Sequence, residues 1–461
     1  MCRVDVRKTV ASTLLCVSIV FVFFILSACS NSADADEQYI VEMDELLSSA
    51  KSSSSVKSSS SKNKVSSSSY GPFKPNNKEF PYAGIPRIEI ETVDRLAIED
   101  RETEIPAKLL IWGEKKAESD TLDLTIRGRG NTSWLAMPKK SYKIEFAKKQ
   151  SLLGMPKDKD WALIANYADK TLMKNYLMYH LSADLGAYYS PRCEFAELYL
   201  NGEYLGVYLV TETIKIGTNR INAPKDSSYI VEFDEKYRKN EQVFFSELVT
   251  GKSYEKPYRV HDPKNASEEV LSIVENHVRA FETAMIEFGS NKENNIEKWI
   301  DIDEYVKHFW LQEFSKNPDS RFYTSVYFSW TVGDVIKMGP VWDFDIAFGG
   351  NSLTEPTEDW YTRESYWNIY VFRDTLVRSE RAKYWKENKS TFSSVLTKID
   401  SVRRVLNDAA KNNFKKWDVL QSTEYDYHRH SYTTYKEAAE DLKTWIKQRI
   451  KWIDSQMQDV K

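Results

Sequence analysis

The sequence predicts an α+β protein with a β-rich N-terminal part and an α-rich C-terminal part. Residues 86–93 alternate between apolar and polar side chains, as a strand with one buried face does. Two apolar runs within 195–210 flank Asn201-Gly202, a pair that favours the tight turn of a β-hairpin. Near the C-terminus, apolar residues recur at helical spacing, namely Leu442, Trp445, Ile446, Ile450 and Ile453.

The remaining elements follow this order of strands first and helices later. Further strands are expected at 105–111, 122–126, 139–146, 161–164 and 229–233. A helix is expected at 171–185, because Leu177 and Leu181 share one face and Gly186 is a suitable stop. Other helices are expected at 266–288, at 301–315 and through most of 375–461.

The first residues predict an export signal rather than part of the fold. Basic residues precede an uncharged apolar run at 13–26, which ends in Leu26-Ser27-Ala28-Cys29. This pattern is typical of a bacterial lipoprotein signal peptide at 1–28, with the lipid on Cys29. A transmembrane helix is the alternative, but the run is short for one. Ser30 after the cysteine favours the outer membrane, so we expect a lipid-anchored protein of the cell envelope.

Residues 29–70 predict a flexible linker between the lipid and the folded part. Ser occupies 14 of the 22 positions from 48 to 69, a composition that cannot bury a core. With Cys29 acylated, Cys193 alone remains outside the signal peptide, which excludes an internal disulfide. The net charge of −4 gives no basic footprint, so we expect no nucleic-acid partner.

Two acidic segments carry the chemistry that the sequence suggests. Asp319 precedes a close pair, Asp343 and Asp345, by about two dozen residues. Carboxylates at i and i+2 on an extended backbone point the same way and repel each other unless a cation lies between them. In phosphoryl transfer, one carboxylate orients the attacking group and others hold Mg²⁺. Exposed acidic residues in a loop are the alternative, although the apolar neighbours Trp342 and Phe344 draw this segment inward.

The motifs around these residues resemble those of the CotH kinase family. The matching segments are Arg127-Gly128-Arg129-Gly130-Asn131, Pro138-Lys139-Lys140-Ser141-Tyr142, 161–169 with Lys174-Asn175, 199–208 with Glu212, Lys316-Asn317-Pro318-Asp319, and 339–345. The resemblance implies an atypical protein-kinase-like fold with two lobes. It also implies ATP-dependent and Mg²⁺-dependent phosphorylation of Ser or other hydroxyl groups on a protein substrate. The expected organisation is an N-terminal β region at 71–126, a CotH-like kinase core at 127–375 and a C-terminal helical region at 376–461.

The resemblance also implies roles for single residues. Asp319 lies where the catalytic base is expected, and Asp343 where the magnesium ligand is expected, with Asp345 as a second candidate. Lys140 would reach the α- and β-phosphates of ATP. Arg129 and Asn131 would border the phosphates.

Glu212 would pair with Lys140 or help to hold the nucleotide. Each basic or acidic residue also has a structural alternative. Lys140 could be a solvated strand residue, Glu212 could form a structural ion pair, and Asp319 could cap a turn.

Two departures from ordinary protein kinases reduce the expectation of a second magnesium site. Thr324 stands where they place an asparagine, five residues after the catalytic Asp, and the glycine turn has only Gly128 and Gly130. Two other functions therefore stay open. One is a non-catalytic surface module that binds protein or polysaccharide through aromatic residues around Trp360 and Trp367. The other is a nucleotidyl transferase on the same fold.

Overall fold

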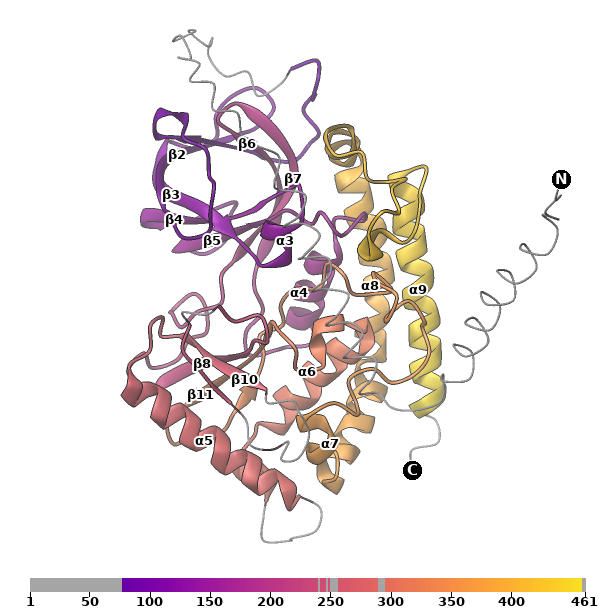
Figure 1. Ribbon diagram of the computed structural model, residues 1–461. Helices are drawn as coiled ribbons and strands as arrows, with labels where there is room; N and C mark the ends of the chain where they lie inside the picture. Colours follow the sequence, from indigo (N-terminus) through magenta and orange to yellow (C-terminus); the bar gives the residue numbers. More distant parts are fainter. Residues whose placement is uncertain (1–76, 239–240, 246–247, 249–255, 289–294, 458–461) are drawn as a thin grey trace, which may run out of the picture. The chain divides into compact units, whose positions relative to one another are not determined.

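The computed structural model describes residues 77–238, 241–245, 248, 256–288 and 295–457 (Figure 1). The chain divides into residues 1–60 and 61–461, and the described residues all belong to the second unit. The predicted signal peptide at 1–28, the lipidated Cys29 and the linker at 29–70 lie outside the described residues. Strands come first and most helices later, so the α+β prediction is confirmed.

The N-terminal strands form a closed seven-stranded barrel in the order β1-β2-β3-β4-β5-β7-β6 (Figure 1). The strands are β1 (Arg87–Thr92), β2 (Ile105–Trp112), β3 (Leu122–Arg129), β4 (Ser141–Gln150), β5 (Asp158–Ile164), β6 (Cys193–Leu200) and β7 (Glu203–Glu212). Neighbours pair antiparallel, except that β1 and β6 are parallel and close the barrel. β3 runs through residue 126, where the β region and the core were expected to meet. The barrel thus draws on both.

Alternation along the strands fills the barrel interior. Ile88, Ile90, Ile126 and Ile144 are almost fully buried in one apolar cluster with Trp161. The predicted hairpin is the pair β6 and β7. Its turn residues, Asn201 and Gly202, have φ values of 52° and 86°, the positive values that a type I′ turn requires.

A second sheet of five strands lies between the barrel strands and the long C-terminal helices in the sequence, and it contains the strand predicted at 229–233. Its order is β12-β11-β8-β10-β9. The strands are β8 (Ser228–Phe233), β9 (Val243–Phe245), β10 (Pro257–Asp262), β11 (Val326–Thr331) and β12 (Lys337–Met338). All residues of the central strand β8 are buried, because helices cover this sheet. A two-lobe kinase layout stays a prediction.

The described helices are α3 (Thr132–Leu135), α4 (Lys174–Asp184), α5 (Glu268–Ile286), α6 (Ile302–Ser315), α7 (Trp367–Val371), α8 (Thr375–Lys416) and α9 (Tyr435–Met457). α4 starts later than the predicted residue 171. Leu172 has a φ of 61°, and the Asp169 carboxylate accepts hydrogen bonds from the backbone N–H groups of Thr171 and Lys174. Asp169 thus occupies the donors that a longer helix would have used.

The end of α8 is joined to the barrel by buried polar contacts. Asn413 Oδ1 accepts hydrogen bonds from Val207 N on β7 at 3.0 Å and from Lys139 Nζ at 2.9 Å. The Lys139 ammonium also donates to the carbonyls of Ala165 and Val207, and burial lowers its pKa well below the usual value. α8 and α9 lie side by side in Figure 1, and together they connect the barrel to the rest of the chain.

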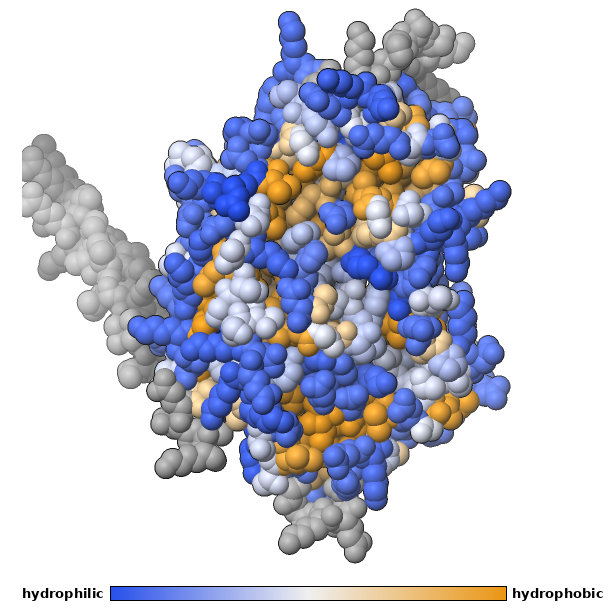
Figure 2. Space-filling model, turned by 180° about the vertical axis from the view of Figure 1, so that it is seen from behind, coloured by the Kyte–Doolittle hydropathy of each residue, from blue (hydrophilic) through white to orange (hydrophobic). Residues whose placement is uncertain are grey.

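Exposed apolar residues come from separate elements. Figure 2 shows one face that is largely hydrophilic, with apolar residues gathered in a few areas. Across the described chain, Val405, Ile286 and Val332 are the most exposed large apolar side chains, and they belong to α8, α5 and the segment after β11. Among the residues that the structure describes, no helix combines the length and the apolar character needed to cross a bilayer.

A substitution at Gly206 tests the contact between β7 of the barrel and the end of α8. Its φ is 94°, and a Cβ there would lie 2.4 Å from Asn413 Oδ1. Gly206→Ala should therefore lower the free energy of unfolding by about 2 kcal/mol or more, because steric overlap adds to backbone strain. Gly202→Ala is the matched control, with a φ of 86° but no atom within 4 Å. It should cost about 1 kcal/mol in urea unfolding. Equal losses in the two variants would contradict the importance of this contact.

Candidate active site

Three carboxyl groups from two chain segments meet beside the second sheet. Asp319 lies in a 3-10 turn, Pro318–Ser320, just after α6, and Asp343 and Asp345 follow β12. Burial raises the pKa of Asp319 well above its usual value, and the charges of Asp343 and Asp345 raise it further. The structure therefore brings the two acidic segments within electrostatic reach of each other.

Asp343 and Asp345 form the closest acidic pair. Their side chains interact, and burial raises the pKa of Asp343. Burial, followed by the charge of Asp343, raises the pKa of Asp345 to about 8. Two buried carboxylates can ionise together only when positive charge is brought to them, and a divalent cation supplies such charge.

Arg129 connects the barrel to this acidic pair. It is the last residue of β3, and its guanidinium carbon lies 5.2 Å from the centre of the Trp342 ring. Burial raises the pKa of Asp343, while the positive charge of Arg129 lowers it. Arg129 is thus a cation from the barrel that faces the acidic segment.

A cavity of about 770 Å³ lies next to the acidic segment, because Trp342 and Arg129 line it, but Asp319, Asp343 and Asp345 are not among its lining residues. Its lining comes from the barrel, from the segment after β7 and from the second sheet. The described lining includes eight basic residues, namely Arg127, Arg129, Lys143, Lys215, Lys236, Arg238, Arg259 and Lys264. It also includes four acidic residues, namely Glu102, Asp160, Asp234 and Glu241. This excess of positive charge suits a polyanionic ligand.

Lys140 does not line this cavity, and Lys143 does. Lys140 Nζ donates instead to the carbonyl of Trp134. Lys143 Nζ lies 2.8 Å from Asp160 Oδ1 and 3.2 Å from Glu145 Oε2, on the side that faces the cavity. Positions an odd number apart along a strand point to opposite faces. The strand predicted at 139–146 has basic residues on both faces, and the face that carries Lys143 is the one toward the cavity.

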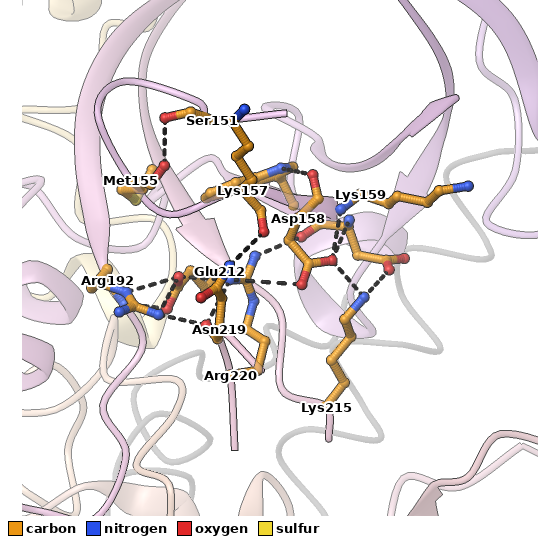
Figure 3. Close-up of polar contacts among 12 residues, drawn as sticks. Ser151, Met155, Lys157, Asp158, Lys159, Arg192, Glu212, Lys215, Asn219 and Arg220 are labelled. Atoms are coloured by element: carbon orange, nitrogen blue, oxygen red, sulfur yellow. Dashed lines mark hydrogen bonds and ion pairs between the residues drawn. The ribbon is translucent and has the colours of Figure 1, made fainter. Parts of the chain in front are cut away.

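Glu212 lies in a structural ion cluster, and the predicted pairing with Lys140 is wrong (Figure 3). Its buried carboxylate is 2.7 Å from Arg220 NH1 and 2.8 Å from Arg192 NH2. The hydroxyl of Tyr189 donates to it at 3.0 Å. These partners occupy the carboxylate, and it is not among the cavity-lining residues. Arg192 and Arg220 pair with Glu212, whereas the Lys140 ammonium donates to the Trp134 carbonyl.

Asn131 lines the cavity as its predicted role requires. It precedes the short helix α3, and its Oδ1 accepts a hydrogen bond from Arg101 NH1 at 2.7 Å. The same arginine NH1 donates to the carbonyl of Gly130 at 2.8 Å. Arg101 therefore fixes the glycine turn that carries Arg129 and Asn131.

Several cavity residues were missed by the sequence reasoning. Asp234, Lys236 and Arg238 follow the predicted strand at 229–233 and line the cavity. They lie in a turn after β8, in which Tyr237 N donates to the Asp234 carbonyl, so strand periodicity gave no signal for them. Burial raises the pKa of Asp234 to about 7, although Arg259 Nε lies 3.2 Å from its carboxylate. The positive charge of Lys236 lowers the pKa of Asp319, so this lysine faces the acidic residues too.

The acidic pair fits a magnesium ion that arrives with a nucleotide. Within the described ranges, no three His, Cys, Asp or Glu side chains form a group that could hold a metal ion by themselves. Mg²⁺ is commonly bound through one or two carboxylates together with substrate phosphates. Asp343 and Asp345 offer two such carboxyl groups, and because both pKa values are raised, binding of a cation there would release a proton.

Comparison with known proteins agrees with the class of protein that this fold and site suggest. The profile of the family described as CotH kinase protein matches residues 126–453, so the chain belongs to that family. The resemblance drawn from the motifs is thereby confirmed. The chain is also similar to the inner spore coat protein H of Bacillus subtilis (strain 168). The two are 26% identical over 287 residues, which cover 61% of this chain and 74% of the relative.

The raised pKa of Asp345 predicts how stability depends on pH when divalent cations are absent. Between about pH 4 and about pH 8 the folded protein retains a proton that the unfolded chain releases. Stability from this group is therefore full at low pH and is lost as the pH rises toward 8. Asp345→Asn does not titrate. Relative to wild type, it should gain more than about 1 kcal/mol of unfolding free energy between pH 5 and pH 8. Urea unfolding with EDTA measures this, and parallel pH curves would contradict the shift.

Proposed function

We propose that this protein transfers the γ-phosphoryl group of ATP to a hydroxyl group, such as that of Ser, on a protein substrate. One observation carries the proposal: Asp319 and the Asp343–Asp345 pair lie within electrostatic reach of one another, next to a cavity that Arg129 and Trp342 line and in which basic residues are in excess. A phosphoryl-transfer site needs a carboxylate for the attacking hydroxyl, carboxylates for Mg²⁺ and cations for the phosphates. Membership of the CotH kinase protein family supports the same reaction class.

In this proposal the nucleotide occupies the cavity of about 770 Å³, which has the size of a small-molecule site. Arg129 and Lys143 face the phosphates, and Asn131 lies beside them at the glycine turn. Lys143 replaces Lys140 in this role because it is the one that lines the cavity. Asp343 and Asp345 would hold Mg²⁺, which neutralises charge on the phosphates when it is bound.

Asp319 then serves as the residue that orients the acceptor. Its carboxylate accepts the hydrogen bond of the hydroxyl and takes the proton as the oxygen bonds to phosphorus. The bond between the γ-phosphorus and the bridging oxygen breaks, and ADP leaves with that electron pair. Lys236, whose charge already acts on Asp319, is placed to stabilise negative charge on the transferred group.

We also propose that the protein works at the cell envelope, held by a lipid on Cys29 and lifted from the outer membrane by the serine-rich linker. The lipoprotein pattern of the sequence supports this. The relative's name, inner spore coat protein H, places that protein in a coat, which also favours a site of action outside the cytoplasm.

The two other functions are less well supported. Of the aromatic residues suggested for a binding module, Tyr366 and Trp367 are buried, and Trp360 and Tyr370 are half-buried against the core. Trp367 is fully buried and lies edge-on to Phe233, with ring centres 5.0 Å apart. A nucleotidyl transferase would use the same cavity and the same carboxylates, so the product decides. Incubation of the full-length protein with MgATP and candidate substrate proteins, followed by mass spectrometry, should add a phosphoryl group and not the heavier adenylyl group. Absence of nucleotide binding in calorimetry would refute both transferases.

The two acidic segments should differ in what they lose. Asp343→Asn should weaken binding of MgATP by about tenfold or more in calorimetry, because a ligand carboxylate is removed at constant volume. Asp319→Asn should bind MgATP about as tightly as wild type but lose about 100-fold or more in turnover. Retained turnover in the second variant would remove Asp319 from the chemistry.

The choice between the two lysines can be tested directly. Lys143→Met should lower kcat/KM for ATP by about 100-fold, because a cation that faces the phosphates is lost. Lys140→Met should change it by less than about threefold, since this ammonium donates to the Trp134 carbonyl away from the cavity. Steady-state kinetics at saturating Mg²⁺ distinguishes them. A larger loss of kcat/KM in Lys140→Met than in Lys143→Met would restore Lys140 to the site.

A further inference from the structure

One peptide group in the acidic segment is held from both sides by buried asparagines. The carbonyl of Asp343 accepts a hydrogen bond from Asn317 Nδ2 at 3.1 Å. The N–H of Phe344, on the other edge of the same peptide plane, donates to Asn175 Oδ1 at 2.7 Å. Asn175 and Asn317 are each 1% exposed, so water does not compete for these bonds.

Asn317 acts on both acidic segments with one side chain. Its Oδ1 accepts a hydrogen bond from the N–H of Asp319 at 3.3 Å and caps the 3-10 turn that carries that residue. Its Nδ2 reaches Asp343 and also Gln312 Oε1 at 3.2 Å, on α6. The distance between the two acidic segments is thus set by the length of one amide side chain.

Asn175 fixes the same peptide to α4. Its Nδ2 donates to Asn166 Oδ1 at 3.1 Å, and Asn166 Nδ2 donates to the carbonyl of Leu172 at 3.1 Å. The neighbouring Lys174 Nζ donates to the carbonyls of Asp345 and Ala347 at 3.3 and 2.7 Å. The first turn of α4 therefore binds the backbone at and after the acidic pair.

The backbone of Asp343 needs such support. Its φ of 65° is uncommon for a residue with a side chain, and a free chain would relax from it. Tyr179, one turn along α4, packs against the residue that precedes Asp343. Its ring stacks on Trp342 with a centre separation of 5.6 Å.

We propose that Asn175 and Asn317 are positioning residues that clamp the peptide between Asp343 and Phe344, and so set the geometry of the cation site relative to the acceptor-orienting carboxylate. This rests on the proposed function. The clamp assigns a task to Asn175 and Asn317, which the sequence motifs contain without an evident role. Neither side chain lines the cavity.

Asn317→Ser separates the clamp from the cap. A serine at this position still caps the turn of Asp319, but it has no amide donor for the Asp343 carbonyl. Binding of Mn²⁺ to the full-length protein with a non-hydrolysable ATP analogue, measured by calorimetry, should weaken by about 10-fold to 100-fold. Metal-free affinity for the analogue should change by less than about twofold. In metal-free protein, amide exchange of a peptide containing Phe344 should accelerate.

Asn368→Ser is the matched control. Asn368 is also buried and makes two side-chain hydrogen bonds, to Tyr305 and to the Thr362 carbonyl, away from the acidic residues. It should lower thermal stability without changing Mn²⁺ affinity or exchange at Phe344. If wild type binds the metal and analogue but Asn317→Ser binds them equally well, the clamp is wrong and the function stands. If wild type binds neither, the proposed function itself fails.

Discussion

The barrel supplies one wall of the cavity, and one buried ammonium group fixes the barrel to the end of α8. Lys139, two residues before β4, donates to the carbonyls of Ala165 and Val207 in two barrel segments. It also donates to Asn413 at the end of α8. Burying a charge without partners would be costly, so the three acceptors make this arrangement specific. Arg129 belongs to the barrel and Asp343 does not. The anchoring of the barrel on α8 therefore contributes to how these two residues face each other.

The same principle recurs where other segments meet. Arg449 on α9 pairs with Glu313 on α6 at 2.6 Å, with both side chains fully buried, and Arg87 pairs with Glu197 inside the barrel wall at 2.8 Å. Such pairs add little net stability, but each costs much to break, so they select one arrangement of the elements. Apolar packing supplies the driving force, while these polar pairs decide which surfaces meet.

Local patterns in the sequence predicted local structure well. The Asn201-Gly202 hairpin needs only its own residues, and α6 begins one residue after Asp301, which caps it. Closure of the barrel was not predictable in the same way, since β1 and β6 pair in parallel across about a hundred residues. The three aspartates were found because their spacing and the family motifs point to them. Lys143 was not given a role, because a strand pattern does not tell which face meets a ligand. Asn175 and Asn317 were not given roles, because their partners are backbone groups that lie far from at least one of them in the sequence.

The 42 residues of α8 have a consequence for how the cavity can change shape. One end lies by the barrel at Asn413, and Arg381 near the other end receives the Trp310 indole of α6 on its carbonyl. A continuous helix tied at both ends behaves as a stiff rod. Swinging of the barrel would have to bend this rod or tear out the Lys139 ammonium. A change in the shape of the cavity would then fall to shorter lining segments, such as 234–238, rather than to movement of the barrel.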